Sequence, residues 1–152
     1  MNPFNAAEGT IEVSLERDEQ LLLSQLVTLL GSVGAAPNDP AADRLNPDAF
    51  LDDVEASREF RRLTADELAT ARDMDRDVFE RTLAGKHLNV DEAEAWVRIL
   101  GDARLALAAR RGVVDGEWED EIETSRDLAV VAYLGFLQGS LVQALVELEA
   151  AA

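Results

Sequence analysis

The sequence of 152 residues has no cysteine and only one histidine, His87. The absence of cysteine excludes a disulfide framework, a thiolate metal site, a cysteine nucleophile and a redox role through the chain's own thiols. A single histidine cannot build a metal cluster or a catalytic triad, and no serine stands in a nucleophile elbow. No phosphate-binding loop is present, and no two of the many carboxylates stand out as an acid and base pair. We therefore expect a protein that is not an enzyme, with no catalytic residues, metal or cofactor.

A basic leader followed by a long apolar run is also missing at the amino terminus, so we expect no signal peptide and a cytoplasmic location. The carboxy-terminal segment is apolar enough to raise the question of a membrane span. It contains Gln138, Ser140 and Gln143 and has acidic residues on both sides, which favours a core helix of a soluble protein. With 47% apolar residues, the chain can bury a core despite a formal net charge of −17.

Charge is distributed unevenly along the chain. Residues 1–55 have a net charge of −9, residues 56–111 are neutral in sum, and residues 112–152 have a net charge of −8. Lys86 is the only lysine, so the cations of the middle third are almost all guanidinium groups, which suit bidentate contacts with carboxylate or phosphate. Two interpretations stay open: an acidic surface with internal ion pairs, or a basic patch for nucleic acid or an acidic protein partner.

The apolar periodicity predicts a single, mainly helical domain: a bundle of about five to six helices with a small N-terminal β-strand or hairpin. Residues 10–15 alternate polar and apolar side chains after Gly9, which is typical of one arm of a hairpin. Residues 64–67 and 89–92 have the spacing of capping boxes that begin helices. The expected elements are a β element over 1–15, a helix over 16–34, a loop over 35–45, short helices over 46–62, helices over 64–84 and 89–111, an acidic loop over 112–123 and a helix over 124–149.

Charged residues occur where the helical periodicity predicts core. Asp75 falls within the apolar arc of the 64–84 helix, and Arg98, Asp102 and Arg104 lie beside the apolar faces of the 89–111 helix. An unpaired buried charge is costly, so these four groups are expected to form an ion-pair network, in which Arg98 and Asp102 can pair along their own helix. The network either fixes the helix register or forms a polar switch or ligand site inside the bundle.

The last helix offers a surface for close packing. Gly135 and Gly139 are one turn apart at the edge of its apolar arc, where small residues let another helix approach. Tyr133 and Phe136 lie toward its more polar side, a position typical of aromatic residues at interfaces. Packing within the chain is one interpretation, and a dimer seam formed by these four residues is the other. We expect a homodimer.

Arginines of the middle third are the candidates for binding DNA or a protein partner: Arg58, Arg61, Arg62, Arg76 and Arg81. Such groups would position the protein on phosphates without specifying a sequence. The helices over 64–84 and 89–111 superficially resemble a helix-turn-helix, but the second helix presents apolar residues rather than a polar recognition surface. Direct DNA binding therefore requires the five arginines to lie together on one accessible side.

Several core and helix-surface segments occur in a characteristic combination: Ile11-Glu-Val-Ser-Leu15, Glu59-Phe-Arg-Arg-Leu-Thr64, Glu92-Ala-Glu-Ala-Trp-Val-Arg98, Gly101-Asp-Ala-Arg-Leu105 and Leu137-Gln-Gly-Ser-Leu-Val142. In these segments, and over most of the chain apart from residues 31–46, the sequence resembles the actinobacterial oxidative-stress regulator family. These AosR-like proteins were long catalogued as a domain of unknown function.

The resemblance implies a cytoplasmic stress-response transcription regulator that binds promoter DNA, an alternative sigma factor or RNA polymerase. Some members are described as sensing oxidation through a closely spaced cysteine pair, which this sequence lacks, so that mechanism does not carry over. The alternative is a helical protein-interaction module or adaptor that does not bind DNA. Binding of a small molecule is a third hypothesis, for which the sequence gives no positive sign.

Overall fold

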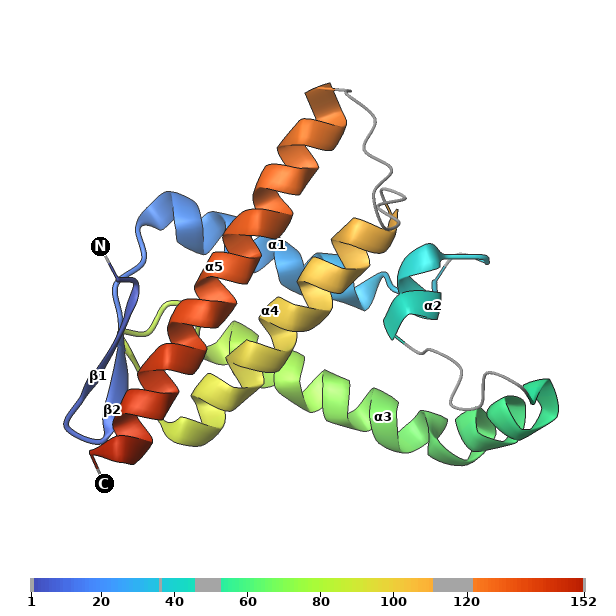
Figure 1. Cartoon of the computed structure of the whole chain (residues 1–152), viewed down its shortest axis with the longest axis horizontal. Coiled ribbons are helices and arrows are strands. Elements are labelled where there is room, and N and C mark those ends of the chain that lie inside the picture. Colours follow the sequence, from blue (N-terminus) through green and yellow to red (C-terminus); the bar gives the residue numbers. More distant parts are fainter. Residues whose placement is uncertain (1, 36, 46–52, 111–121, 152) are drawn as a thin grey trace.

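The computed structural model describes residues 2–35, 37–45, 53–110 and 122–151, apart from the side chains of residues 61, 65, 66 and 122–125 (Figure 1). The elements are β1 (Phe4–Ala7), β2 (Thr10–Val13), α1 (Arg17–Gly31), α2 (Pro40–Leu45), α3 (Val54–Thr82), β3 (His87–Leu88), α4 (Val90–Arg110) and α5 (Ile122–Ala150). The fold is mainly helical with a small N-terminal β-sheet, which confirms the predicted fold class. Residues 46–52 of the expected short helices and residues 112–121 of the expected acidic loop lie outside the described residues.

The N-terminal sheet begins with the predicted hairpin. Glu8 and Gly9 both have positive φ angles, 49° and 83°, which suit the two-residue turn that joins twisted antiparallel strands. β1 and β2 then pair in antiparallel register, with Ala7 opposite Thr10 next to the turn. The short strand β3 adds to the other edge of β2, in a stretch between two predicted helices where no strand was expected. The hairpin lies beside the C-terminal end of α5 (Figure 1).

Helix α4 begins with the capping box that its sequence predicts. The amide of Glu92 donates to the side-chain oxygen of Asn89 at 2.8 Å, and the amide of Asn89 donates to the Glu92 carboxylate at 2.9 Å. Glu16 and Glu19 form the same reciprocal arrangement at the start of α1. Each box satisfies backbone amides that have no partner within the helix.

The predicted break between a short helix and a 64–84 helix is wrong, because α3 runs without interruption over 29 residues. The hydroxyl of Thr64 does not cap a new helix; it donates to the carbonyl of Phe60 at 2.8 Å inside the existing one. No glycine or proline occurs from Val54 to Thr82, so no residue there terminates the helix. The cap is Asp53, whose carboxylate accepts the amide of Ala56 at 2.9 Å.

The 35–45 stretch, predicted to be a loop, contains the short helix α2. Asp39 precedes Pro40, and its carboxylate accepts the amide of Ala41 at 3.0 Å. An acidic residue at the cap followed by proline at the first helical position favours the start of a helix. Helix α1 ends at Gly31, earlier than the predicted residue 34.

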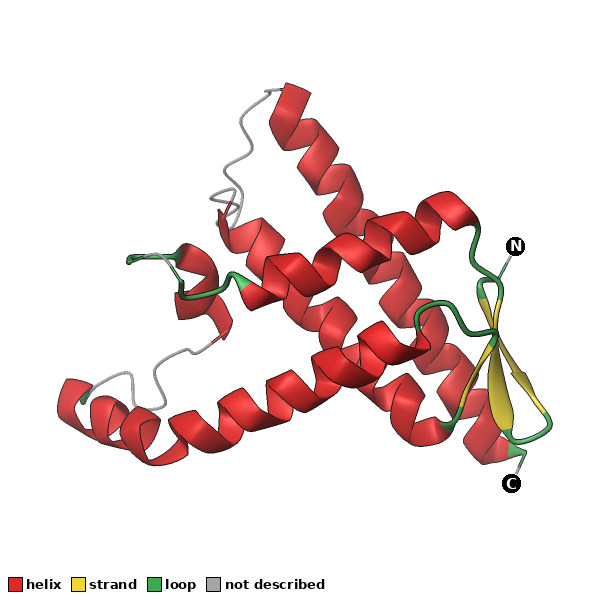
Figure 2. Cartoon of the chain, turned by 180° about the vertical axis from the view of Figure 1, so that it is seen from behind, coloured by secondary structure: helices red, strands yellow, loops and turns green. Residues whose placement is uncertain are grey.

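Helix α4 lies at the centre of the fold, and α5 packs along one side of it while α2 and α3 pack on other sides (Figure 1, Figure 2). This confirms that a helix with two apolar faces is covered on two sides. Trp96 is fully buried on α4 and packs against Phe4 and Phe79, with ring centroids 6.1 and 4.7 Å away. Its indole Nε1 donates to the Thr82 hydroxyl at 2.7 Å, so the core includes a satisfied polar contact.

Candidate functional site

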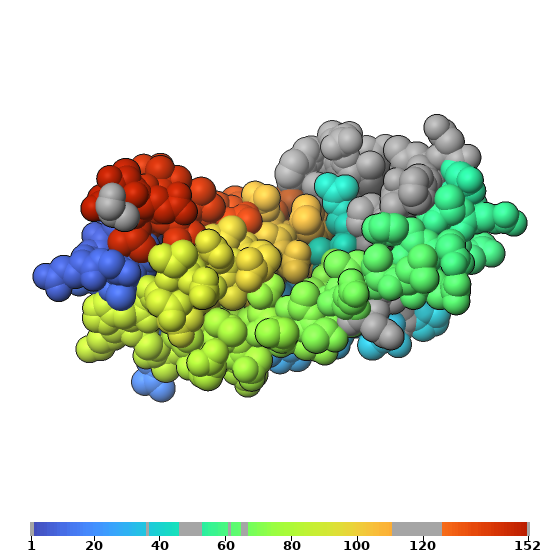
Figure 3. Space-filling model, turned by 90° about the horizontal axis from the view of Figure 1, so that it is seen from below, coloured from blue at the N-terminus to red at the C-terminus, as the bar shows by residue number. Residues whose placement is uncertain are grey.

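Helix α3 carries the five candidate arginines and Asp75. Its C-terminal half packs on α4, whereas its N-terminal end projects beyond the crossing of α4 and α5 (Figure 1, Figure 3). The uninterrupted helix therefore holds an interior-facing segment and a projecting segment in one rigid element. The side of α3 that faces α4 and its outward side are both candidate binding surfaces.

The five candidate arginines are spread along α3 among acidic residues. Arg62 donates to both carboxylate oxygens of Glu59, at 3.2 and 2.5 Å, and Arg76 forms an ion pair with Asp73. The side chain of Arg58 lines a shallow depression together with Asp53, Glu55 and Glu59. Arg81 is exposed near the far end of the helix, and the Arg61 side chain lies outside the description. Of the described candidates, Arg62 and Arg76 are thus paired with acids of their own helix, and Arg58 lies beside acids.

One ion pair joins α3 to α4 among the four residues of the expected network. The guanidinium of Arg98 donates to the two oxygens of Asp75 at 2.8 and 2.9 Å. These hydrogen bonds raise the pKa of Arg98 above its ordinary value. The side chain of Arg98 is 56% exposed, so the pair contributes no more than about 1 kcal/mol to stability.

The other two residues of that network line the same surface depression as this pair, and the charges of Asp75 and Arg98 act on the pKa of Asp102. Arg98 forms its ion pair with Asp75 on α3 and not with Asp102 on its own helix. Asp102 is half-buried, and burial raises the pKa of its carboxyl group. Arg104 lies against α5, where its Nη1 is 3.3 Å from the position that a Cβ at Gly135 would take.

The four residues of the possible dimer seam divide into two groups. The hydroxyl of Tyr133 donates to the carboxylate of Glu19 on α1, and Gly135 is covered by Arg104, so both are used within the chain. Phe136 is exposed, and a Cβ added at Gly139 would meet no atom of the described chain within 4 Å. The outward side of α5 therefore includes Phe136 and Gly139 but not the other two.

Sequence reasoning missed a second ion pair, between Asp39 and Arg110. Two hydrogen bonds of 3.2 and 2.8 Å join the guanidinium to the carboxylate, which also accepts the amides of Gly34 and Ala41. These contacts hold the pKa of Asp39 well below its usual range. The order Asp39-Pro40 was a usable signal for a helix cap, but nothing in the sequence connects it with a residue on α4.

Large apolar side chains are exposed on α3 and α5. On α3 they include Leu63 and Met74, which are 66% and 64% exposed. On α5 they include Phe136, Val142 and Val146. Among the described residues, the stretch Arg126–Ala150 is long and apolar enough to cross a membrane, with a mean hydropathy of 1.7. Core helices of soluble proteins meet the same criterion, and α5 buries Leu134, Leu137 and Leu141 inside the fold.

No group of three or more histidine, aspartate or glutamate side chains is placed to hold a metal ion in the part of the chain that the structure describes. Comparisons with curated proteins and with solved structures gave no match. A family model described as a domain of unknown function (DUF2017) matches residues 1–145. Because that match covers nearly the whole sequence, the chain belongs to the DUF2017 family.

Proposed function

We propose that this protein is a stress-response transcription regulator that docks on a protein of the transcription machinery, a sigma factor or RNA polymerase, and does not itself read promoter DNA. The resemblance of the sequence to the oxidative-stress regulator family supports a role in transcription. The arrangement of charged and apolar side chains on α3 supports docking on a protein.

The pairing of arginines with neighbouring carboxylates is the observation that carries this proposal. A protein that binds DNA neutralises several phosphates with cations gathered on one face. On α3, Arg62 and Arg76 are each paired with an acid three residues earlier, and Arg58 is flanked by acids. The net charge of −17 adds a long-range repulsion from a polyanion.

The outer face of α3 offers a surface of the kind that proteins recognise. Leu63 and Met74 are eleven residues apart, which places them on the same side of a helix about three turns from each other. A shallow depression beside Met74 is lined by Glu67, Thr70 and Ala71. Exposed leucine and methionine side chains rimmed by polar groups suit insertion of a helix face into an apolar groove.

The charge of the chain also indicates which kind of partner surface it fits. An acidic protein associates faster and more specifically with a basic surface. Proteins that bind nucleic acid present such basic surfaces, so a sigma factor or polymerase subunit is a complementary partner. Because the chain has no cysteine, we propose that an oxidative signal reaches it through the partner.

The proposal is tested with purified sigma factors, RNA polymerase and labelled promoter fragments. We expect binding to one of the proteins and no retardation of DNA at physiological salt. The double variant Leu63→Glu with Met74→Glu should abolish the complex. Leu21→Glu, which changes an exposed apolar residue on α1, should leave it intact.

The opposite pattern would select direct DNA binding. Promoter fragments would then be retarded in a salt-dependent manner, and the double variant Arg61→Ala with Arg62→Ala would weaken that binding on all sequences. If the double variant at Leu63 and Met74 still binds polymerase, the outer face of α3 is not the docking surface.

A further inference from the structure

The surface depression that the four network residues share has a volume of about 530 Å³ and is lined by residues of α3, α4 and α5. Its apolar lining consists of Leu68 and Ala71 on α3 and of Val97, Gly101 and Leu105 on α4. Leu68 is 44% exposed, so part of this apolar lining is open to solvent. At about 30 Å³ for each water-sized group, the volume has room for roughly seventeen such groups. The depression can therefore accommodate an aliphatic chain together with a polar head group.

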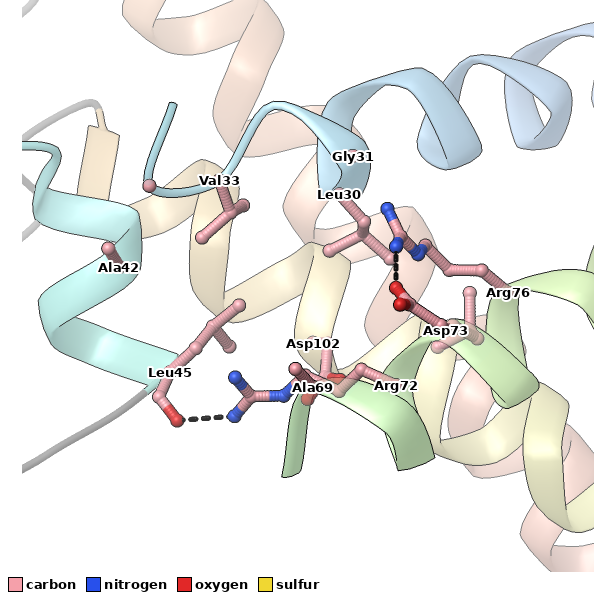
Figure 4. Close-up of a pocket in the computed structure, with 12 residues that line it drawn as sticks. Leu30, Gly31, Val33, Ala42, Leu45, Ala69, Arg72, Asp73, Arg76 and Asp102 are labelled. Atoms are coloured by element: carbon pink, nitrogen blue, oxygen red, sulfur yellow. Dashed lines mark hydrogen bonds and ion pairs between the residues drawn. The ribbon is translucent and has the colours of Figure 1, made fainter. Parts of the chain in front are cut away.

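Two of the three arginines in the lining are already engaged by groups of the chain. Arg98 donates hydrogen bonds of 2.8 and 2.9 Å to the carboxylate of Asp75. Nη2 of Arg72 donates to the backbone carbonyl of Leu45 on α2 at 2.6 Å (Figure 4). The positive charge of Arg72 also lowers the pKa of the Asp102 carboxyl, against the effect of burial. Each of these two arginines is thus accompanied by one aspartate of the lining, and the four charges sum to zero.

Arg104 is the third arginine of the lining, and no aspartate accompanies it. Its side chain is half-buried and lies next to Gly135 of α5. Among the residues that the structure describes, none forms a hydrogen bond or an ion pair with Arg104. Its charge is also not among those that act on the pKa of Asp102. A half-buried guanidinium without a counterion is unfavourable, and it leaves the depression with one positive charge in excess.

We propose that this depression binds an aliphatic monocarboxylate. The carboxylate accepts two hydrogen bonds from the guanidinium of Arg104, the geometry that arginine offers to a planar anion. The hydrocarbon chain packs on Leu68 and Leu105, which removes exposed apolar surface from water. A dicarboxylate would bring a second negative charge close to Asp75 and Asp102. An alcohol or an amine of the same length would leave the Arg104 charge without a counterion.

The ligand site goes beyond the proposed docking and does not depend on it. Leu68 is five residues after Leu63, so the two side chains point about 140° apart around the axis of α3. Leu63 belongs to the docking surface, and Leu68 lines the depression. The chain alone is therefore sufficient for a binding test, and a failure of docking leaves the ligand site unaffected.

The test uses the full chain and four compounds in calorimetric and thermal-shift titrations. Octanoate has the chain and the carboxylate, octanol lacks the charge, octylamine has the opposite charge, and acetate lacks the chain. We expect octanoate to raise the melting temperature, because it binds the folded state. It should bind at least about tenfold more tightly than octanol, since the alcohol cannot form the charge-assisted hydrogen bonds. Octylamine and acetate should bind more weakly still.

Two matched pairs of variants locate the binding. Arg104→Gln should remove the preference for octanoate over octanol, whereas Arg81→Gln makes the same charge change outside the depression and should keep it. Leu68→Glu should abolish the binding of octanoate, because it replaces an apolar contact by a like charge. Leu63→Glu makes the same substitution on the docking surface and should bind octanoate as the unmodified chain does.

The proposal is overturned if octanoate does not bind, if octanol binds as tightly, or if Arg104→Gln keeps the preference for octanoate. Should Arg104→Gln fail to fold, the leucine pair decides: equal binding of octanoate to Leu68→Glu and Leu63→Glu places the ligand elsewhere and overturns the proposal.

Discussion

Asp39 and Arg110 are 71 residues apart in the sequence and form a bidentate ion pair that ties the loop before α2 to the last turn of α4. The Asp39 side chain is only 7% exposed, and its carboxylate accepts hydrogen bonds from a guanidinium and from two backbone amides. A cation in the last turn of α4 is also favourable for the helix dipole. The ion pair therefore fixes the N-terminal end of α2 to the C-terminal end of α4.

Replacement of Asp39 by asparagine should lower stability in a pH-dependent way. The pKa of Asp39 is depressed in the fold, so its contribution is fully present above the unfolded value of about 3.9 and is lost as the pH falls below it. Urea unfolding at a series of pH values should give a constant deficit for Asp39→Asn above about pH 5 that shrinks below about pH 4. Asp43→Asn, on the exposed side of α2, is the control, and an equal deficit there would contradict the assignment.

The Thr82 hydroxyl should contribute more to the free energy of unfolding than the Thr64 hydroxyl on the same helix. It accepts the indole N–H of Trp96 and donates to the carbonyl of Val78 at 2.7 Å. Thr82→Val leaves a buried N–H without an acceptor and should cost about 1–3 kcal/mol in urea unfolding. Thr64→Val removes a hydroxyl with the same bond to a carbonyl four residues back but no indole contact, and should change stability by less than about 0.5 kcal/mol. Equal losses would show that the indole bond contributes nothing.

Tyr133 is the only tyrosine, so phenolate absorbance reports its ionisation directly. Burial, then the hydrogen bond to Glu19 and the charges of Glu19 and Glu16, raise its pKa far above the ordinary value. Stability linked to the neutral phenol is fully present below about pH 10 and is lost as the pH rises above it. Glu19→Gln should shift the titration to lower pH, whereas Asp18→Asn on the same helix should have a smaller effect. A midpoint near pH 10 in the folded chain would contradict the contact between α5 and α1.

Alanine at the two glycines of α5 should have different effects. A Cβ at Gly139 enters open space, so Gly139→Ala should stabilise the folded chain by about 1 kcal/mol through helix propensity alone. A Cβ at Gly135 meets Arg104 at 3.3 Å, so Gly135→Ala should give a smaller gain or a loss. Thermal unfolding at several protein concentrations measures both. A loss for Gly139→Ala that depends on protein concentration would instead identify a homodimer seam.

Local signals in the sequence predicted much of the fold. The alternation after Gly9 predicted the hairpin, and the spacing of Asn89 and Glu92 predicted the start of α4, because both depend on neighbouring residues. The capping-box spacing at Thr64 wrongly predicted the start of a helix, because it also depends only on neighbouring residues. A helix that is already under way, without a terminating residue, uses the hydroxyl for a bond to a preceding carbonyl.

Contacts between distant segments could not be predicted from neighbouring residues in the sequence. β3 exists because Leu88 meets Ile11 of β2, a pairing set by the packing of the helices between them. The sequence placed Asp75 and Arg98 in one network but indicated Asp102 as the acid that Arg98 can pair with along its helix, whereas the structure pairs Arg98 with Asp75. Gly135 and Gly139 also look alike in the sequence, because both lie at the edge of the apolar arc of the last helix. Only the position of Arg104 in the structure shows that Gly135 is covered and Gly139 is open.

The continuity of α3 has a mechanical consequence. A helix of 29 residues, at about 1.5 Å per residue, has a contour length of roughly 43 Å. The same helix therefore connects the exposed Leu63 to Thr82, whose hydroxyl accepts the indole N–H of the buried Trp96.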